Sequence, residues 1–176
     1  MQVVSIKDNP NLISFLRENL KEVDEAHLLE NYHPDYEKSL GNIFRVISKG
    51  RFDVGNYFVM ITDQGEYAGS AGWNHLDDST ALALVRAYVP KKFRTNYIMG
   101  EHILPKIIEE TADYKHTWIT FNDYNKMMYD AIVRIRSRKS SSLLPWPDIY
   151  RKFKPLGQHT VNNILQYVAE YERSIP

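Results

Sequence analysis

The spacing of apolar residues changes along the chain, and each change predicts a different kind of element. Residues 3–6 are mostly apolar and indicate a short strand, and Asp8-Asn9-Pro10 is typical of a helix start. Apolar residues then recur at helical spacing over 12–23 and, after a second helix start, over 36–47. The beginning of the chain therefore predicts one strand followed by two helices.

The middle of the chain switches to the pattern of strands. Residues 57–62, 67–73 and 80–89 are rich in apolar, aromatic and β-branched side chains, and short polar turns separate them. Two glycines, Gly69 and Gly72, interrupt the second of these segments. Because short turns join neighbouring antiparallel strands, the sequence predicts a three-stranded antiparallel meander.

The following part of the chain alternates between helix and strand. Apolar residues at helical spacing over 103–108 and 124–135 enclose a strand-like segment at 117–121. A strand, a helix and another strand in this order predict a parallel crossover, with 117–121 parallel to 80–89.

The end of the chain predicts two more strands, over 153–161 and 164–171. Alternating side chains favour a strand for the second segment, and a terminal helix is the alternative. Together the elements predict one domain over residues 1–176, of the α/β class. Its sheet is expected to be mixed, mostly antiparallel and twisted, with about seven strands and with helices on both faces.

Composition narrows the classes of function. Hydrophobic residues make up 43% and charged residues 25% of the chain, and Lys plus Arg equal Asp plus Glu at 22 each. A balanced charge disfavours nucleic acid as the main partner, because nonspecific affinity for phosphates depends on excess cationic charge. The chain has no cysteine, and its six histidines show no ligand spacing, so we expect no disulfide, thiolate nucleophile or metal site.

No apolar run approaches the roughly 20 residues needed to span a bilayer, and the N-terminus does not read as a signal peptide. We therefore expect a cytoplasmic protein without a membrane partner.

Three segments carry a resemblance to a known family. They read Ala87-Tyr88-Val89-Pro90-Lys91-Lys92-Phe93-Arg94-Thr95-Asn96-Tyr97-Ile98-Met99-Gly100, Asn122-Asp123-Tyr124-Asn125-Lys126-Met127-Met128-Tyr129 and Phe153-Lys154-Pro155-Leu156-Gly157. With the elements around them, they resemble the GNAT superfamily of acyl-CoA-dependent N-acyltransferases. The first segment matches the family's fourth strand, its Val-x-Pro turn and its phosphate loop. The second matches the Asn-led helix after strand five, and the third the start of the next strand.

The phosphate loop departs from the family's pattern, which usually reads Arg/Gln-x-x-Gly-x-Gly/Ala. Aligned on Arg94, the two small positions fall on Tyr97 and Met99, and Gly100 comes one residue late. Small residues serve there because the pyrophosphate has to approach the backbone of a helix N-terminus closely. Two alternatives stay open. Either the loop is longer and the helix starts near Gly100, which keeps Pro105 in or near its first turn, or the loop binds no acyl-CoA.

The resemblance implies acetyl-CoA as the co-substrate and an amine as its acceptor. Backbone groups at the splayed end of strand four would hold the thioester, loop amides would bind the pyrophosphate, and two asparagines would contact the pantetheine arm or the substrate. The residues so implied are Ala87, Tyr88, Val89, Arg94, Thr95, Asn96, Ile98, Gly100, Asn122 and Asn125. Alternatively, Arg94 belongs to an exposed basic turn and Asn122 is a helix cap.

The resemblance also implies an acid for the departing thiolate and a base for the attacking amine. Tyr129 lies seven residues after Asn122 and matches the family's acidic tyrosine, and a phenol is protonated at neutral pH. By its place in the helical pattern, Tyr129 is equally a core tyrosine. For the base, the sequence offers His75, Glu66 and Asp77 near the ends of the meander, where each is alternatively a turn residue.

Three hypotheses of function follow. The first is an N-acetyltransferase that moves an acetyl group from acetyl-CoA to a small-molecule amine or a protein amino group by direct attack. The second is a noncatalytic binding or regulatory module on the same fold, favoured by Tyr97 and Met99 in the phosphate loop. The third is a nucleic-acid-binding accessory protein that uses the basic run at 134–139, and a net charge of zero disfavours it. None of the three excludes a homodimer.

Overall fold

The structure is a computed structural model, and it describes residues 1–16, 18–19, 55–137 and 146–173. Residues 12–16 and 18–19 are helical, as their apolar spacing predicts. The helix predicted over 36–47 lies outside the described residues.

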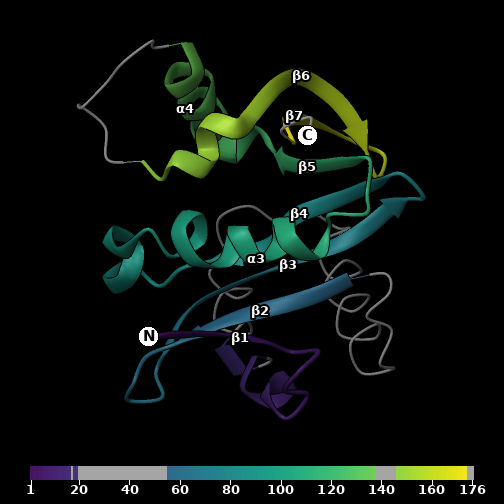
Figure 1. Ribbon diagram of the computed structural model, residues 1–176. Helices are drawn as coiled ribbons and strands as arrows, with labels where there is room; N and C mark the ends of the chain where they lie inside the picture. Colours follow the sequence, from purple (N-terminus) through teal and green to yellow (C-terminus); the bar gives the residue numbers. More distant parts are fainter. Residues whose placement is uncertain (17, 20–54, 138–145, 174–176) are drawn as a thin grey trace.

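Seven strands form one mixed sheet in the order β1-β2-β3-β4-β5-β7-β6 (Figure 1). All neighbours are antiparallel except β4 and β5, which are parallel. The strands are β1 (Gln2–Ser5), β2 (Gly55–Ile61), β3 (Tyr67–Asp77), β4 (Thr80–Tyr88), β5 (His116–Phe121), β6 (Phe153–Val161) and β7 (Ile164–Tyr171). This topology confirms the predicted meander and the parallel crossover, and it shows that the last segment is a strand and not a helix.

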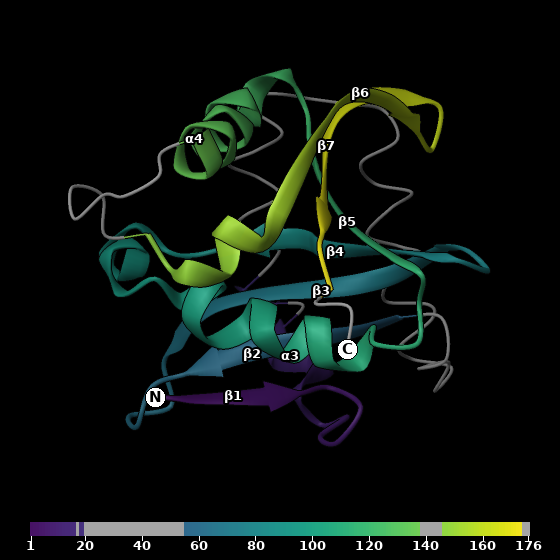
Figure 2. The same ribbon diagram turned by 45° about the horizontal axis from the view of Figure 1, so that its top comes forward.

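Helices connect the strands of the second half of the chain. α3 (Leu104–Glu110) lies between β4 and β5 in the sequence, and α4 (Lys126–Ser137) between β5 and β6. Shorter helical turns are η1 (Lys91–Asn96), η2 (Met99–Ile103), η3 (Asp123–Asn125) and η4 (Asp148–Lys152). Figure 2 shows the twist of the sheet, with β7 running across the direction of β1 and β2.

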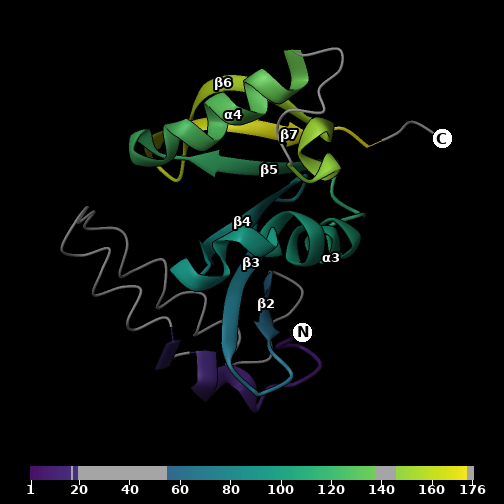
Figure 3. The same ribbon diagram turned by 90° about the vertical axis from the view of Figure 1, so that its left-hand side faces the viewer.

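Side chains pack on both faces of the sheet. On one face, called the α3 face, Ile107 of α3 and Ile132 of α4 belong to one cluster with Ile119 of β5. On the opposite face, called the second face, Leu16 packs with Tyr57 of β2. Successive residues of a strand point to opposite faces, and both faces are covered here. β2 is therefore buried along nearly its whole length. Helical residues thus cover both faces, as predicted, and Figure 3 gives the side view.

β4 and β5 pair over only part of their length. The ladder joins residues 80–83 to residues 116–119 and ends there, although β4 continues to Tyr88. The continuation of β4 pairs with β3 alone, so the two parallel strands diverge, as Figure 1 shows. Within the part of the chain that the structure describes, one edge of the end of β4 therefore has no partner strand.

The helix after β4 begins close to the position that the longer-loop alternative predicts. That alternative places the start near Gly100, and η2 begins at Met99, after Ile98 with a helical backbone (φ −49°, ψ −44°). η2 is a π turn in which Leu104 N–H donates to Met99 O. A proline inside a regular α-helix clashes with the carbonyl four residues earlier. The wide turn ends where α3 begins, so Pro105 falls in the first turn of α3, where proline is tolerated.

Candidate functional site

The end of β4 has an unusual backbone. Leu84 and Arg86 have φ values of 57° and 55°, in the left-handed region that residues other than glycine rarely adopt. Such a conformation costs roughly 1–3 kcal/mol per residue and persists where neighbouring groups hold it, which is common at functional sites. Residues 87–89, which are predicted to hold the thioester, follow directly, and Ala87 is exposed. The edge predicted to bind the acyl group therefore begins where β4 leaves regular strand geometry.

A cationic loop continues from this strand end. In η1, which follows Pro90, the side chains of Lys91, Lys92 and Arg94 are exposed. Arg94 Nε donates to the carbonyl oxygen of Val89 at 3.1 Å, which holds the guanidinium close to the end of β4. Exposed cationic groups just before a helix start suit a phosphate-bearing ligand.

The two bulky residues of the phosphate loop have different environments. Thr95 and Asn96 complete η1, and Tyr97 follows in the left-handed conformation (φ 49°, ψ 29°) with an exposed side chain. Met99 is half-buried and packs against the core of the α3 face. Met99 therefore points away from the loop surface, and Tyr97 is the residue that occupies it.

Gly100 and Ile98 turn toward the protein interior. A Cβ added at Gly100 would lie 2.6 Å from Tyr150 Cε2 and 2.7 Å from Pro147 Cγ, so the small size of this residue lets η4 pack against η2. Ile98 is buried in the core of the α3 face. The predicted pyrophosphate contact of these two residues is therefore limited to their backbone N–H groups.

Asn122 caps the helical segment that leads into α4. Its Oδ1 accepts a hydrogen bond of 2.9 Å from Asn125 N–H. This geometry confirms the alternative interpretation of Asn122 as a helix cap. Both side chains are exposed, and their contact with the pantetheine arm stays a prediction.

Tyr129 packs in the core and is hydrogen-bonded at its tip. Its side chain is 8% exposed, and its ring lies 6.2 Å from the ring of Phe121 and 5.1 Å from that of Tyr167. The N–H of Gly157 donates to the Tyr129 hydroxyl oxygen at 3.0 Å. This contact lies on β6, at the bulge next to Gly157.

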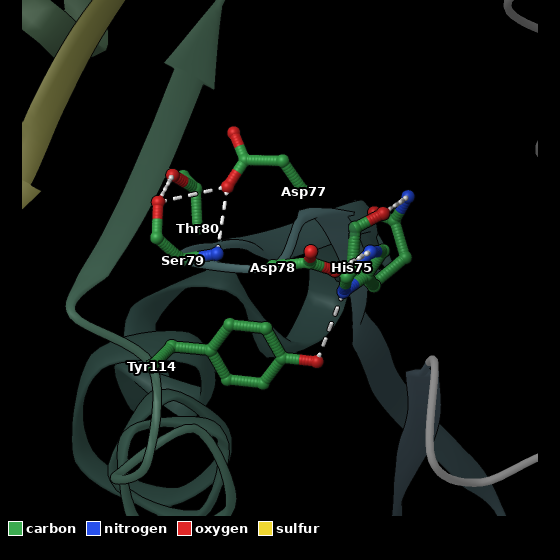
Figure 4. Close-up of polar contacts among 7 residues, drawn as sticks. His75, Asp77, Asp78, Ser79, Thr80 and Tyr114 are labelled. Carbon is green, nitrogen blue, oxygen red and sulfur yellow. Dashed lines mark hydrogen bonds and ion pairs between the residues drawn. The ribbon is translucent and has the colours of Figure 1, made fainter.

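His75 lies in a small polar group at the turn from β3 to β4 (Figure 4). Its Nδ1 is 3.3 Å from the Tyr114 hydroxyl, and its Nε2 is 4.0 Å from Asp78 Oδ1. In the same turn, Asp77 Oδ1 accepts from Ser79 N–H at 2.8 Å and from Ser79 Oγ at 2.9 Å. These bonds lower the pKa of Asp77, the backbone N–H contributing most. Asp77 is therefore a turn residue, which was the alternative interpretation.

The candidate bases lie at opposite ends of β3. Glu66 directly precedes β3 and forms an ion pair with Lys92 of the cationic loop. His75 is nine residues further on, roughly 30 Å away at about 3.3 Å per strand residue. The structure thus places Glu66 beside the loop and the end of β4, and it places His75 at the far end of these strands.

Comparisons with known proteins agree on the architecture. No protein-family model and no curated protein sequence matches the chain. Among solved structures, an acetyltransferase of the GNAT family from Staphylococcus aureus is similar over 97% of this chain and 98% of its own, with a TM-score of 0.61 and 14% identity. An acetyltransferase from Streptococcus agalactiae is similar over 98% of both chains, with a TM-score of 0.62 and 11% identity. The paia N-acetyltransferase from Thermoplasma acidophilum, in complex with coenzyme A, is similar over 98% of this chain and 100% of its own, with a TM-score of 0.61 and 11% identity.

The chain has the GNAT fold. Within this fold, the site residues predicted from the sequence lie in three separate places. One group gathers at the end of β4 and in the loop after it, and Glu66 lies beside this group. Asn122, Asn125 and Tyr129 lie on η3 and at the start of α4, and His75 lies apart from both groups.

Sequence reasoning missed a contact that holds the end of β4. The Tyr57 hydroxyl, on β2, donates to the carbonyl oxygen of Arg86 at 2.7 Å. Gly72 was the only sign of this contact in the sequence, because a glycine inside a strand often marks the close approach of another group. The spacing of residues did not show that Tyr57 is the group that approaches Gly72.

Two findings concern metal sites and membrane spans. Among residues 1–16, 18–19, 55–137 and 146–173, no group of three or more His, Asp or Glu side chains could hold a metal ion. Across the same residues, no helix is both long and apolar enough to cross a membrane.

Proposed function

We propose that this protein is an N-acetyltransferase that uses acetyl-CoA as its acetyl donor and an amine as its acceptor. The observation that carries the proposal is the end of β4, where a left-handed backbone, a strand edge without a partner strand among the described residues, and a cationic loop follow one another. A structural neighbour is a complex with coenzyme A, which supports coenzyme A as the ligand of this region.

The chain's own residues would bind and orient the donor. The backbone of residues 87–89 would hold the thioester carbonyl, because the edge beyond residue 83 has no strand beside it in the described part of the chain. Arg94 and the N–H groups at Ile98 and Gly100 would bind the pyrophosphate. Acetyl-CoA would supply an activated acyl group, whose bond to sulfur breaks as the bond to the amine nitrogen forms.

Two groups are available for the protons. Glu66 is the candidate base nearest the end of β4, and it would take a proton from the attacking amine after release from Lys92 or through a water molecule. Tyr129 is the candidate acid. Its oxygen accepts the N–H of Gly157, so its own proton is free to be donated to the departing thiolate.

The acceptor is proposed as an amine without a narrower identity. Structural neighbours include spermidine N-acetyltransferase variants from Vibrio cholerae, at 11% identity and a TM-score of 0.54 for one of them. Spermidine is therefore a reasonable first amine for an activity screen, together with diamines and peptides that have a free N-terminus.

A noncatalytic module remains the second candidate, and Tyr97 favours it. This residue occupies the loop surface where the family has a small residue. At Gly100, residues of η4 and Pro147 before it fill the space where a side chain would lie. Under this alternative the wild type does not bind acetyl-CoA, whereas Tyr97→Gly does.

Titration calorimetry with acetyl-CoA separates the two candidates. We expect wild-type binding, weakened about tenfold in Arg94→Ala because a charge-assisted contact to phosphate is lost. Arg134→Ala is the matched control, since Arg134 is an exposed arginine in the last turn of α4, and the affinity of this variant for acetyl-CoA should stay unchanged. Absence of binding at millimolar acetyl-CoA contradicts the proposed function.

A further inference from the structure

β4 carries two bulges opposite one residue of β3. The register of the two strands shifts on both sides of Gly72, and on each side β4 has one residue more than β3. The residues with left-handed φ, Leu84 and Arg86, fall in these two bulges. The pairs that define the shifts are Ser70 with Tyr88, Gly72 with Val85, and Trp73 with Ala83.

Tyr57 contacts one of these bulges from two strands away. It lies on β2, its side chain is 0% exposed, and its hydroxyl donates to the carbonyl oxygen of Arg86 at 2.7 Å. Since β3 separates β2 from β4, the side chain of Tyr57 has to cross a whole strand to reach this carbonyl.

Gly72 leaves the room for that crossing. A Cβ added at Gly72 would lie 2.3 Å from Cδ2 and 2.7 Å from Cε2 of the Tyr57 ring. Real Cβ atoms essentially never approach other heavy atoms within 3.0 Å, so any larger residue at this position would displace the ring. Gly72 therefore leaves the space that the Tyr57 ring needs, and the Tyr57 hydroxyl binds the Arg86 carbonyl.

This contact sets the direction of a neighbouring N–H group. A peptide unit is planar and trans, so the C=O of Arg86 and the N–H of Ala87 point in opposite directions. A bond that fixes the Arg86 carbonyl also fixes the Ala87 N–H, at the start of the edge proposed to hold the thioester. We infer that Tyr57 is a positioning residue that holds the Ala87 peptide in the orientation that binds the acyl donor. The inference rests on the proposed function for the identity of that donor.

Removing only the hydroxyl tests the inference. In Tyr57→Phe the ring still fills the space over Gly72, while the Arg86 carbonyl loses the hydrogen bond from the Tyr57 hydroxyl. We expect acetyl-CoA to bind this variant about tenfold more weakly than the wild type in titration calorimetry, as a lost buried hydrogen bond predicts. In ¹⁵N NMR spectra without ligand, the amide signal of Ala87 should shift.

Tyr67→Phe is the matched control. Tyr67 is also buried, and its hydroxyl contacts Ser70 Oγ at 2.7 Å, so the bond that it loses lies within β3. We expect this variant to lose stability as Tyr57→Phe does, but to keep the wild-type affinity for acetyl-CoA and the wild-type Ala87 signal.

The possible results separate the inference from the proposed function. If the wild type does not bind acetyl-CoA, the proposed function fails and the inference fails with it. If the wild type binds and Tyr57→Phe binds equally well, the inference alone is overturned. If Tyr67→Phe weakens binding as much as Tyr57→Phe, the effect is one of general packing, and this also overturns the inference.

Discussion

The indole Nε1 of Trp73 donates to the Glu110 carboxylate at 2.6 Å, which ties the end of α3 to the middle of β3. Asn56 Nδ2 donates to the same carboxylate at 2.8 and 3.0 Å. A negative charge at a helix C-terminus is unfavourable by itself. These donors offset that cost, so the carboxylate becomes a fixed link between α3 and two strands.

Glu110→Gln should therefore destabilise the protein. The amide nitrogen of glutamine would face the Asn56 amide or the Trp73 indole, which leaves two donors opposed at a cost of about 1–3 kcal/mol in the free energy of unfolding. Denaturant unfolding measures this loss. The control is Glu109→Gln, whose exposed carboxylate pairs with Lys106 at 3.2 Å and should change stability by less than about 0.5 kcal/mol. Equal effects of the two substitutions would contradict the role given to Glu110.

Gly100→Ala should force η4 away from η2. Its Cβ would meet Tyr150 and Pro147 at distances that the packed core cannot accept, so we expect a loss of about 1–3 kcal/mol in denaturant unfolding. Gly65→Ala is the comparison, because it introduces backbone strain without a clash. Gly65 has a φ of +80° and no atom within 4 Å of an added Cβ, so its substitution should cost only about 1 kcal/mol.

Tyr129→Phe should affect both turnover and stability. As the proposed general acid, its loss should lower kcat by roughly 10²–10⁴-fold with little change in KM for acetyl-CoA. The Gly157 N–H would also lose its acceptor, at a cost of about 1–3 kcal/mol. Steady-state kinetics and denaturant unfolding of the same variant distinguish the two roles. Lower stability with unchanged kcat would leave Tyr129 as a core residue only.

Asp77 should make stability depend on pH in the acid range. Hydrogen bonds from Ser79 hold the pKa of Asp77 below its ordinary value. A carboxyl with a lowered folded-state pKa contributes stability above its unfolded pKa, and this contribution is lost as pH falls through the folded pKa. Asp77→Asn should thus lower Tm at pH 7, and the difference from wild type should shrink below pH about 4. Asp78→Asn, at the exposed neighbouring residue, is the control for removing a carboxylate from this turn.

Much of the fold could be predicted because it depends on local patterns. The meander follows from the change of period near Tyr57 and from short turns such as Asp77-Asp78-Ser79. The cap at Asn122 depends on a residue only three positions away. The alternating side chains of 164–171 predicted a strand, and the structure confirms it.

The candidate site was less predictable because its geometry depends on partners far away in the sequence. The Tyr129 hydroxyl meets an N–H of Gly157, and the Arg86 carbonyl meets the hydroxyl of Tyr57. No spacing rule reports such pairs. The start of the helix before Pro105 was predicted to within about one residue, but the π form of its first turn was not.

The four residue pairs that join β4 to β5 lie at the junction between two antiparallel parts of the sheet. β1 to β4 form one antiparallel unit and β5, β7 and β6 another, and among the described strands this short parallel ladder is the one that pairs the two units. The hydrophobic cluster of the α3 face runs across the junction, with Leu104 on one side and Ile132 on the other. Cooperative unfolding of the two halves as one unit is therefore carried mainly by buried side chains and only to a small extent by the hydrogen-bond ladder.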